Sequence, residues 1–297
     1  MDLEQKLNNG DFVTLTEFIP PKGTDVSAMV ENAERIRGSM DALVIPDMNG
    51  AVMRMSALGA AAILQRRGFQ AVMEMNCRDR NRLALQADLL AAAALDITKV
   101  IVTAGDDLAA GDHPEAKAVF DADMLVLLEA IAGLQQGKDM AGRALQGSPR
   151  FLVGTTTKAT LKGKQLKAEV ELVRKQAQRG AAYFVTPPLF DISAIEPFLQ
   201  LIDGEGIKII PKVLLLKSLG MARYIDAHND LIDIPPSIIE RIEDAEDIPR
   251  ELMRIATETI AALKERGFSG VLLSTAGWER RLPEILGVQL KDTFQRN

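Results

Sequence analysis

The sequence TLTEFIPP occupies residues 14–21, and it decides how the rest of the chain is interpreted. An apolar, β-branched run carries one carboxylate, Glu17, and then stops at Pro20 and Pro21. Proline cannot continue a ladder of hydrogen bonds and disfavours helix at the residue before it, so the run predicts a strand with Glu17 at its carboxyl end. In parallel α/β proteins, catalytic groups gather at the carboxyl ends of the strands.

Glu17 has two interpretations in this position. A desolvated glutamate among apolar neighbours has a raised pKa and can donate a proton near neutral pH. A glutamate at a strand end can equally form an ion pair with a lysine or an arginine and serve the structure alone. The segment itself is compatible with both.

Strand-like runs and amphipathic helical patterns alternate along the whole chain. The predicted strands are Val13–Ile19, Ala42–Ile45, Ala71–Cys77, Lys99–Ala104, Phe151–Thr155, Ala182–Thr186, Lys208–Leu216 and Val271–Ser274. Helical patterns between them include Ser27–Arg37, Ser56–Arg67, Asn81–Ala94, Asp123–Leu134 and Lys164–Arg179. Eight strand–helix repeats in about 250 to 300 residues are typical of an α/β fold of the TIM-barrel type, (β/α)8. A doubly wound sheet is the alternative, but the chain has neither G-x-G-x-x-G after a strand nor G-x-x-x-x-G-K-[ST].

No linker rich in Pro, Gly or Ser divides the chain, so residues 1–297 are predicted to form one domain. Two insertions stand out. Asp106–Asp121 is a polar loop after the fourth strand, on the face where barrel enzymes carry their active sites. Asp226–Arg266 contains two further helical patterns, so extra helices are expected between strands 7 and 8, for packing or subunit contact.

The composition excludes several classes of protein. A net charge of −6, without cationic stripes interleaved with aromatic residues, argues against a nucleic-acid partner. The single cysteine, Cys77, rules out an internal disulfide and a multi-thiolate metal site. No apolar run approaches the roughly 18 residues that a membrane span needs, and the amino end has no signal-like region. We expect a cytoplasmic protein that does not contact membranes.

Polar residues collect at the ends of the predicted strands and should face one bowl. They are Glu17, Asp47, Glu74 with Asn76, Gly105 with Asp106 and Asp107, Thr155 to Lys158, and Thr186 to Pro188. Each has an ordinary structural explanation, such as a turn cap or a β-forming threonine. Carboxylates at three strand ends are harder to explain by structure, because each costs desolvation. A metal is not expected, since the only histidines are His113 and His228, in separate loops.

An ordered set of motifs resembles the methylenetetrahydrofolate reductases. The motifs are TEFIPP (16–21), CRDRNRLALQ (77–86), Gly105-Asp106, GDHPEAK (111–117) with VFD (119–121), Gly180-Ala181, TPPLFD (186–191) and Leu286-Gly287. They span nearly the whole chain in order. The resemblance implies a (β/α)8 barrel that binds FAD and reduces 5,10-methylenetetrahydrofolate to 5-methyltetrahydrofolate.

The resemblance also implies roles for individual residues. Glu17 matches the general acid that protonates N10 so that the ring opens and accepts a hydride. Asp106 matches an aspartate beside the flavin pyrimidine ring and is counted with Glu17 as catalytic. The implied cofactor-binding residues are Glu74, Thr103, Ala104, Gly105, Asp106, Phe120, Asp121, Thr155 and Glu169, and the implied substrate-binding residues are Thr186, Pro187, Met221 and Ile225.

Several positions depart from the family pattern. Pro187 stands where a glutamine contacts folate or nicotinamide, and Met221 and Ile225 replace a glutamine and a stacking phenylalanine. Pro46 and Glu74 replace a threonine and a histidine near the flavin. These departures resemble the short bacterial branch from acetogens, in which electrons can come from NAD(P)H or from a partner protein, in a homo-oligomer or a hetero-complex. The alternatives are a non-catalytic or electron-relay subunit and a flavin-free pterin-binding methyltransferase barrel.

Overall fold

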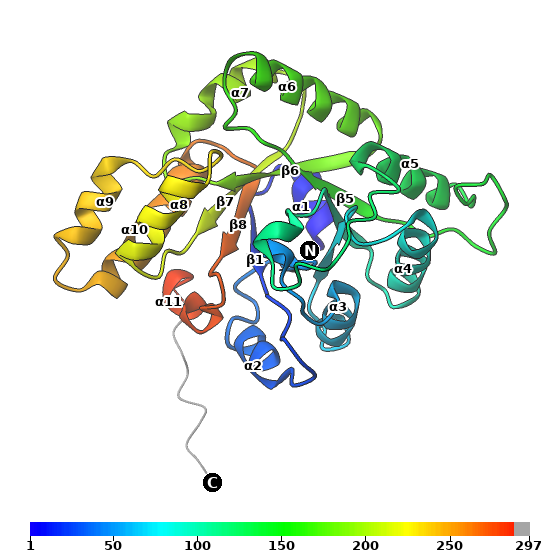
Figure 1. Cartoon of the computed structure of the whole chain (residues 1–297), viewed down its shortest axis with the longest axis horizontal. Coiled ribbons are helices and arrows are strands. Elements are labelled where there is room, and N and C mark those ends of the chain that lie inside the picture. Colours follow the sequence, from blue (N-terminus) through cyan, green and yellow to red (C-terminus); the bar gives the residue numbers. More distant parts are fainter. Residues whose placement is uncertain (288–297) are drawn as a thin grey trace, which may run out of the picture.

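The computed structural model describes residues 1–287, and its eight parallel strands close into a barrel in the order β1 to β8 (Figure 1). The strands are β1 (Val13–Glu17), β2 (Ala42–Ile45), β3 (Ala71–Asn76), β4 (Lys99–Thr103), β5 (Leu152–Thr156), β6 (Ala181–Pro188), β7 (Ile209–Leu214) and β8 (Gly270–Ser274). The predicted (β/α)8 fold is confirmed, and every strand ends within two residues of its predicted bounds. The end of the predicted 1–297 domain lies outside the described residues.

Alternate residues of the strands point into the barrel and form a core of their own. This inner core includes Val13 and Leu15 of β1, Val72 of β3 and Ile210 of β7. The side-chain period of a strand is two residues, so Glu17, Glu74 and Lys212, each two positions further on, point to the same inner side. The strand sequences thus set a charged layer above an aliphatic one.

The helices form the outer layer. They are α1 (Leu3–Asn9), α2 (Ser27–Arg35), α3 (Ala57–Gln65), α4 (Arg82–Ala94), α5 (Met124–Gln135), α6 (Gly163–Gln178), α7 (Glu196–Leu201), α8 (Leu219–His228), α9 (Pro236–Glu243), α10 (Ile248–Glu265) and α11 (Leu282–Ile285). The 3-10 helices are η1 (Asn49–Ala51), η2 (Leu108–Ala110), η3 (Ile192–Ile195) and η4 (Glu279–Arg281). The five helices predicted by residue range, α2 to α6, are confirmed within two residues at each end.

Helix α1 closes the amino end of the barrel, a feature that the sequence analysis did not predict. Its Leu3 and Leu7 are buried in the inner core. The backbone N–H of Leu3 donates to Gln70, just before β3, and Asp2 forms an ion pair with Lys99 at the start of β4. The helix therefore seals the end opposite the predicted site.

The insertion between β7 and β8 contains the expected extra helices. Helices α8, α9 and α10 gather on one side of the barrel, and α9 packs against both of the others (Figure 1). The two helical patterns expected in Asp226–Arg266 are α9 and α10, and α10 also packs on β7 and β8. No helix within the described residues is long and apolar enough to cross a membrane.

Candidate functional site

A pocket of about 370 Å³ opens at the carboxyl end of the barrel. Its walls come from the ends of β3 to β7 and from the segments that follow β2, β4 and β5. The lining residues are Asp47, Asn49, Glu74, Thr103, Ala104, Gly105, Asp106, Thr156, Thr157, Lys158, Val185, Thr186, Pro187, Lys212 and Leu231. Polar residues from five of the six strand ends singled out in the sequence thus meet in one cavity, and Glu17, from the sixth, contacts the lining residue Lys212.

Glu17 ends β1 and forms an ion pair across the barrel. Its Oε1 lies 2.6 Å from Nζ of Lys212 on β7, and the residue is only 2% exposed. Lys212 also lines the pocket, whereas Glu17 does not. Of the two interpretations of Glu17, ion pairing is therefore observed, with a lysine that itself lines the cavity.

Glu74, on β3, faces the pocket beside the same lysine. Its pKa is raised to about 7, first because burial disfavours the charged form and then because Glu17 and Asp47 add negative charge, while Lys212 partly opposes the shift. Burial alone would lower the pKa of Lys212, but the carboxylates of Glu17 and Glu74 raise it above its ordinary value. The cluster thus combines a firmly charged lysine with a carboxyl group that titrates near neutral pH.

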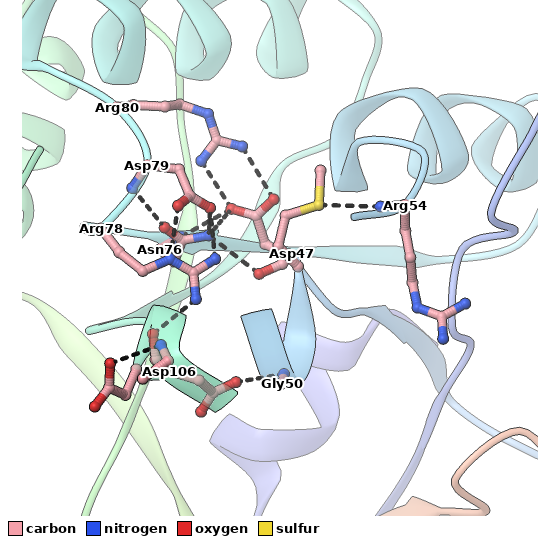
Figure 2. A network of polar contacts seen from close by, with 11 residues as sticks. Asp47, Gly50, Arg54, Asn76, Arg78, Asp79, Arg80 and Asp106 are labelled. Atoms are coloured by element: carbon pink, nitrogen blue, oxygen red, sulfur yellow. Dashed lines mark hydrogen bonds and ion pairs between the residues drawn. The ribbon is translucent and has the colours of Figure 1, made fainter. Parts of the chain in front are cut away.

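Asp47 follows β2 and is held by a network from the next strand (Figure 2). Arg80 donates to both of its carboxylate oxygens, at 2.7 and 3.0 Å. Asn76, at the end of β3, donates to Asp47 through its backbone N–H at 3.0 Å and through its side-chain amide at 2.8 Å. The negative charge of Asp47 is thereby compensated and its position on the pocket wall is fixed.

Arg78 connects the end of β3 to the loop after β4. The guanidinium is buried, 2% exposed, and donates to Asp79 at 2.6 and 2.7 Å and to the backbone carbonyl of Asp106 at 2.8 Å (Figure 2). Gly105 has φ +91°, and a Cβ there would lie 2.7 Å from Cβ of Arg78. Only glycine fits both this backbone conformation and this close approach.

The carboxylate of Asp106 is exposed and has a backbone partner. It accepts a 2.6 Å hydrogen bond from the N–H of Gly50 in η1 (Figure 2). The loops after β2 and β4 are therefore joined at the pocket rim. Within residues 1–287, no group of three or more His, Cys, Asp and Glu side chains could hold a metal ion.

Comparisons with known proteins agree with the barrel. An EDTA monooxygenase (EmoA) from Chelativorans sp. BNC1 superposes with a TM-score of 0.57 at 10% identity, covering 93% of each chain. A 2,3-dimethylmalate lyase of the PEP mutase/isocitrate lyase superfamily gives 0.50 at 12% identity, covering 89% of this chain and 97% of the other. At such identities the likeness shows the fold alone. We found no significant match among curated protein sequences.

The model of one family, methylenetetrahydrofolate reductase, matches residues 2–288. The chain belongs to this family. The match covers nearly the whole sequence, as the ordered motifs predicted. Membership of the methylenetetrahydrofolate reductases supports reductase activity on folate at the level of the family.

Residues expected at the cofactor from the reductase resemblance fall into two groups. Glu74, Thr103, Ala104, Gly105 and Asp106 line the pocket. Phe120, Asp121, Thr155 and Glu169 do not. Thr155 is buried and donates to the carbonyl of Val102, so it ties β5 to β4.

Glu169, on α6, holds the segment after β5 from behind. Its Oε1 accepts hydrogen bonds from the hydroxyl of Thr157 and from the backbone N–H of Lys158, both at 2.8 Å. The carboxylate is buried and satisfied by these contacts. Glu169 thus supports two residues that line the pocket.

Phe120 and Asp121 lie in the segment between η2 and α5. Phe120 is 55% exposed and has φ +40°, which is unusual for a bulky residue and costs backbone energy. Asp121 pairs with Arg82 at the start of α4, and hydrogen bonds from Arg82 lower the pKa of Asp121 below its ordinary value.

Of the four residues expected to bind the substrate, two line the pocket and two do not. Thr186 and Pro187 on β6 line the pocket. Met221 and Ile225 on α8 are partly buried against the main hydrophobic core and do not line it.

Three charged residues of the site were not predicted from the sequence: Lys212, Arg78 and Arg80. Lys212 carried a signal, since it is the single charge within the otherwise apolar run IIPKVL of β7. Arg78 and Arg80 lay within a motif quoted for the family, but nothing in their spacing indicated which carboxylates they bind.

Proposed function

We propose that this chain is a flavin-dependent reductase that converts 5,10-methylenetetrahydrofolate to 5-methyltetrahydrofolate, as one flavin-binding barrel domain. The observation that carries the proposal is the cluster of Glu17, Glu74 and Lys212 at the mouth of a barrel from this family. The reaction consumes one proton, and this cluster offers ionisable carboxyl groups beside a cavity.

The donor set of the pocket fits a flavin. The backbone of Thr103 to Asp106 offers hydrogen-bonding groups on one wall, and Ala104, Val185, Pro187 and Leu231 offer apolar surface. Lys158 is exposed at the pocket and takes part in no ion pair within residues 1–287, so its ammonium is available to a phosphate. Bound in its reduced form, FAD would supply the hydride that the methylene carbon accepts.

Glu17 is the proposed general acid. Protonation at N10 breaks the bond between N10 and the methylene carbon and leaves an electrophilic carbon for the hydride. Asp106, at the rim, is proposed to oppose negative charge on the reduced cofactor. Thr186 and Pro187 are proposed to contact the folate from β6.

A second candidate function is an electron-relay subunit of a reductase complex. Met221 and Ile225 favour it, because they pack into the core instead of presenting an amide and an aromatic ring to the pocket. In that case the electrons reach the flavin from a partner protein and not from NAD(P)H.

The absorption spectrum of the purified protein tests the proposal. We expect a yellow protein with noncovalently bound FAD. After anaerobic reduction, addition of 5,10-methylenetetrahydrofolate should reoxidise the flavin and yield 5-methyltetrahydrofolate. A colourless preparation that fails to bind added FAD would contradict the flavin assignment, and bound flavin that folate cannot reoxidise would favour the relay subunit.

A further inference from the structure

Glu17, Glu74 and Lys212 come from strands that are not neighbours. β1 pairs with β2 and β8, β3 with β2 and β4, and β7 with β6 and β8. Their side chains therefore meet only across the barrel interior. Both carboxyl groups act electrostatically on the ammonium of Lys212, in a region closed off below by the inner aliphatic core.

The lysine is already committed to one of the two carboxylates. Nζ of Lys212 lies 2.6 Å from Oε1 of Glu17. Within residues 1–287, Glu74 takes part in no ion pair at 4.0 Å or less, although it lines the pocket beside Lys212. Glu17 is therefore held in a buried ion pair, whereas the carboxyl group of Glu74 faces the cavity with no cation bound to it within the described residues.

We propose that Glu74 is the proton store of this site, holding the proton that the reduction consumes and passing it to Glu17, with Lys212 as the shared counter-charge. This inference rests on the reductase function proposed above. The reduction forms a C–H bond at the methylene carbon, using the hydride of the reduced flavin, and breaks the bond to N10. Glu74 passes its proton to Glu17, and Glu17 passes it to N10 as the bond between N10 and the methylene carbon breaks. Glu74, which lines the pocket, then takes a replacement proton from solvent.

The surrounding charges favour a neutral Glu74. Burial comes first among the causes that raise its pKa to about 7, and the carboxylates of Glu17 and Asp47 add to it. Asp47 is itself paired with Arg80, and Asp106 adds negative charge on the lysine side. Tyr183 of β6 stays neutral, since burial and then the charge of Glu74 raise its pKa. Near neutral pH, Glu74 is thus partly protonated and exchanges its proton readily.

Infrared spectroscopy of the full-length protein as purified tests this directly, because a protonated carboxyl group has a carbonyl stretch separate from that of carboxylates. In a titration from pH 5 to pH 9, the wild type should lose one such band with a midpoint of about 7. The band should be absent in Glu74→Gln, and in Lys212→Met its midpoint should move to higher pH. Glu129→Gln is the matched control, since Glu129 is a surface residue paired with Arg179.

The pH dependence of folate reduction supplies the second readout. The wild-type rate should fall above about pH 7, and Glu74→Gln should lower the rate at pH 7 on the order of tenfold or more. The variant should also lose the inflection near pH 7. Two outcomes would overturn the role of Glu74 as proton store. One is a protein that reduces folate although no carboxyl group titrates between pH 6 and pH 8. The other is a Glu74→Gln variant whose rate of folate reduction has the same pH profile as wild type. A titrating Glu74 in a protein that never reduces folate would instead overturn the proposed function. The wild-type titration requires no variant to fold.

Discussion

Glu17 and Glu74 have the same side chain on the same side of the barrel, and their surroundings give them different chemistry. Glu17 is paired with Lys212, whereas Glu74 faces the cavity without a cation of its own within the described residues. Two carboxyl groups with unequal environments are a recurrent way to divide acid and base roles. At the scale of the residue, each group can be tested separately.

Glu17→Gln should remove folate reduction and leave reduction of the flavin by its electron donor nearly unchanged. The reason is that the proton is needed only when folate is reduced. We expect a loss of about a hundredfold or more, measured by stopped-flow reoxidation of the reduced protein. A folate reduction rate within about twofold of wild type would refute the role of Glu17.

Glu74 should make stability depend on pH. Its pKa rises from 4.5 to about 7 on folding, so the folded state binds more protons between these values. The free energy of unfolding should therefore fall as the pH rises from about 4.5 through 7, by at most about 3 kcal/mol from this group. Glu74→Gln should lack this term, so its stability relative to wild type should increase between pH 5 and pH 8. Denaturant unfolding at pH 5 and pH 8 measures the free energy of unfolding of each protein, with Glu129→Gln as the control. The same change with pH in wild type and in Glu74→Gln would contradict the shifted pKa.

At the scale of the element, the turn after β4 is constrained both by its backbone conformation and by a close neighbour. Gly105 (φ +91°) and Gly180 (φ +96°) have nearly the same φ, but a Cβ at Gly105 would meet Arg78 at 2.7 Å, while one at Gly180 would meet nothing within 4 Å. The two glycines therefore separate backbone strain from crowding.

Gly180→Ala should cost about 1–2 kcal/mol, the usual penalty for a side chain in the left-handed region. Gly105→Ala should cost more and should also weaken FAD binding, by about tenfold or more, because the turn must move away from Arg78. Thermal unfolding and flavin titration measure the two effects. Equal FAD affinity in both variants would show that the turn after β4 does not shape the flavin site.

The local sequence predicted where the strands and helices lie along the chain. It predicted less well which side chains of different elements contact one another. Strand and helix periodicity predicted β1 to β8 and α2 to α6, because side chains must alternate or repeat to bury one face. Helix α1 was missed, since its apolar face has few residues and gains its burial only after the barrel has closed over Leu3 and Leu7. The polar residues at the strand ends indicated a shared pocket at the carboxyl end of the barrel. They did not indicate which of these residues contact one another.

At the scale of the whole molecule, the next prediction concerns the source of the electrons that reduce the flavin. A hydrogen-bonding amide contributes roughly 1–1.5 kcal/mol and a stacking aromatic about 0.5–1.5 kcal/mol beyond its buried area. The chain has Pro187, Met221 and Ile225 at the matching positions. We therefore expect NADH and NADPH to reduce the flavin of the isolated chain slowly.

Stopped-flow mixing of the isolated protein with each nucleotide measures this. Slow bleaching that accelerates when a co-purifying subunit is added would support a partner protein as the donor. Rapid, saturable bleaching at micromolar NADH or NADPH would show instead a self-sufficient reductase, with residues such as Lys158 supplying the polar contacts.

The sequence by itself determined the barrel, the family and the carboxylate at the end of the first strand. These three features depend on the local periodicity of apolar residues, on prolines that end a strand, and on the order of motifs along the sequence. Only the tertiary structure decided that Glu17 pairs with Lys212, that Glu74 lies beside them, and that Asp47 belongs to Arg80. The physical reason is that closure of the barrel brings together inward side chains of β1, β3 and β7, and their charges affect one another only across that buried interior.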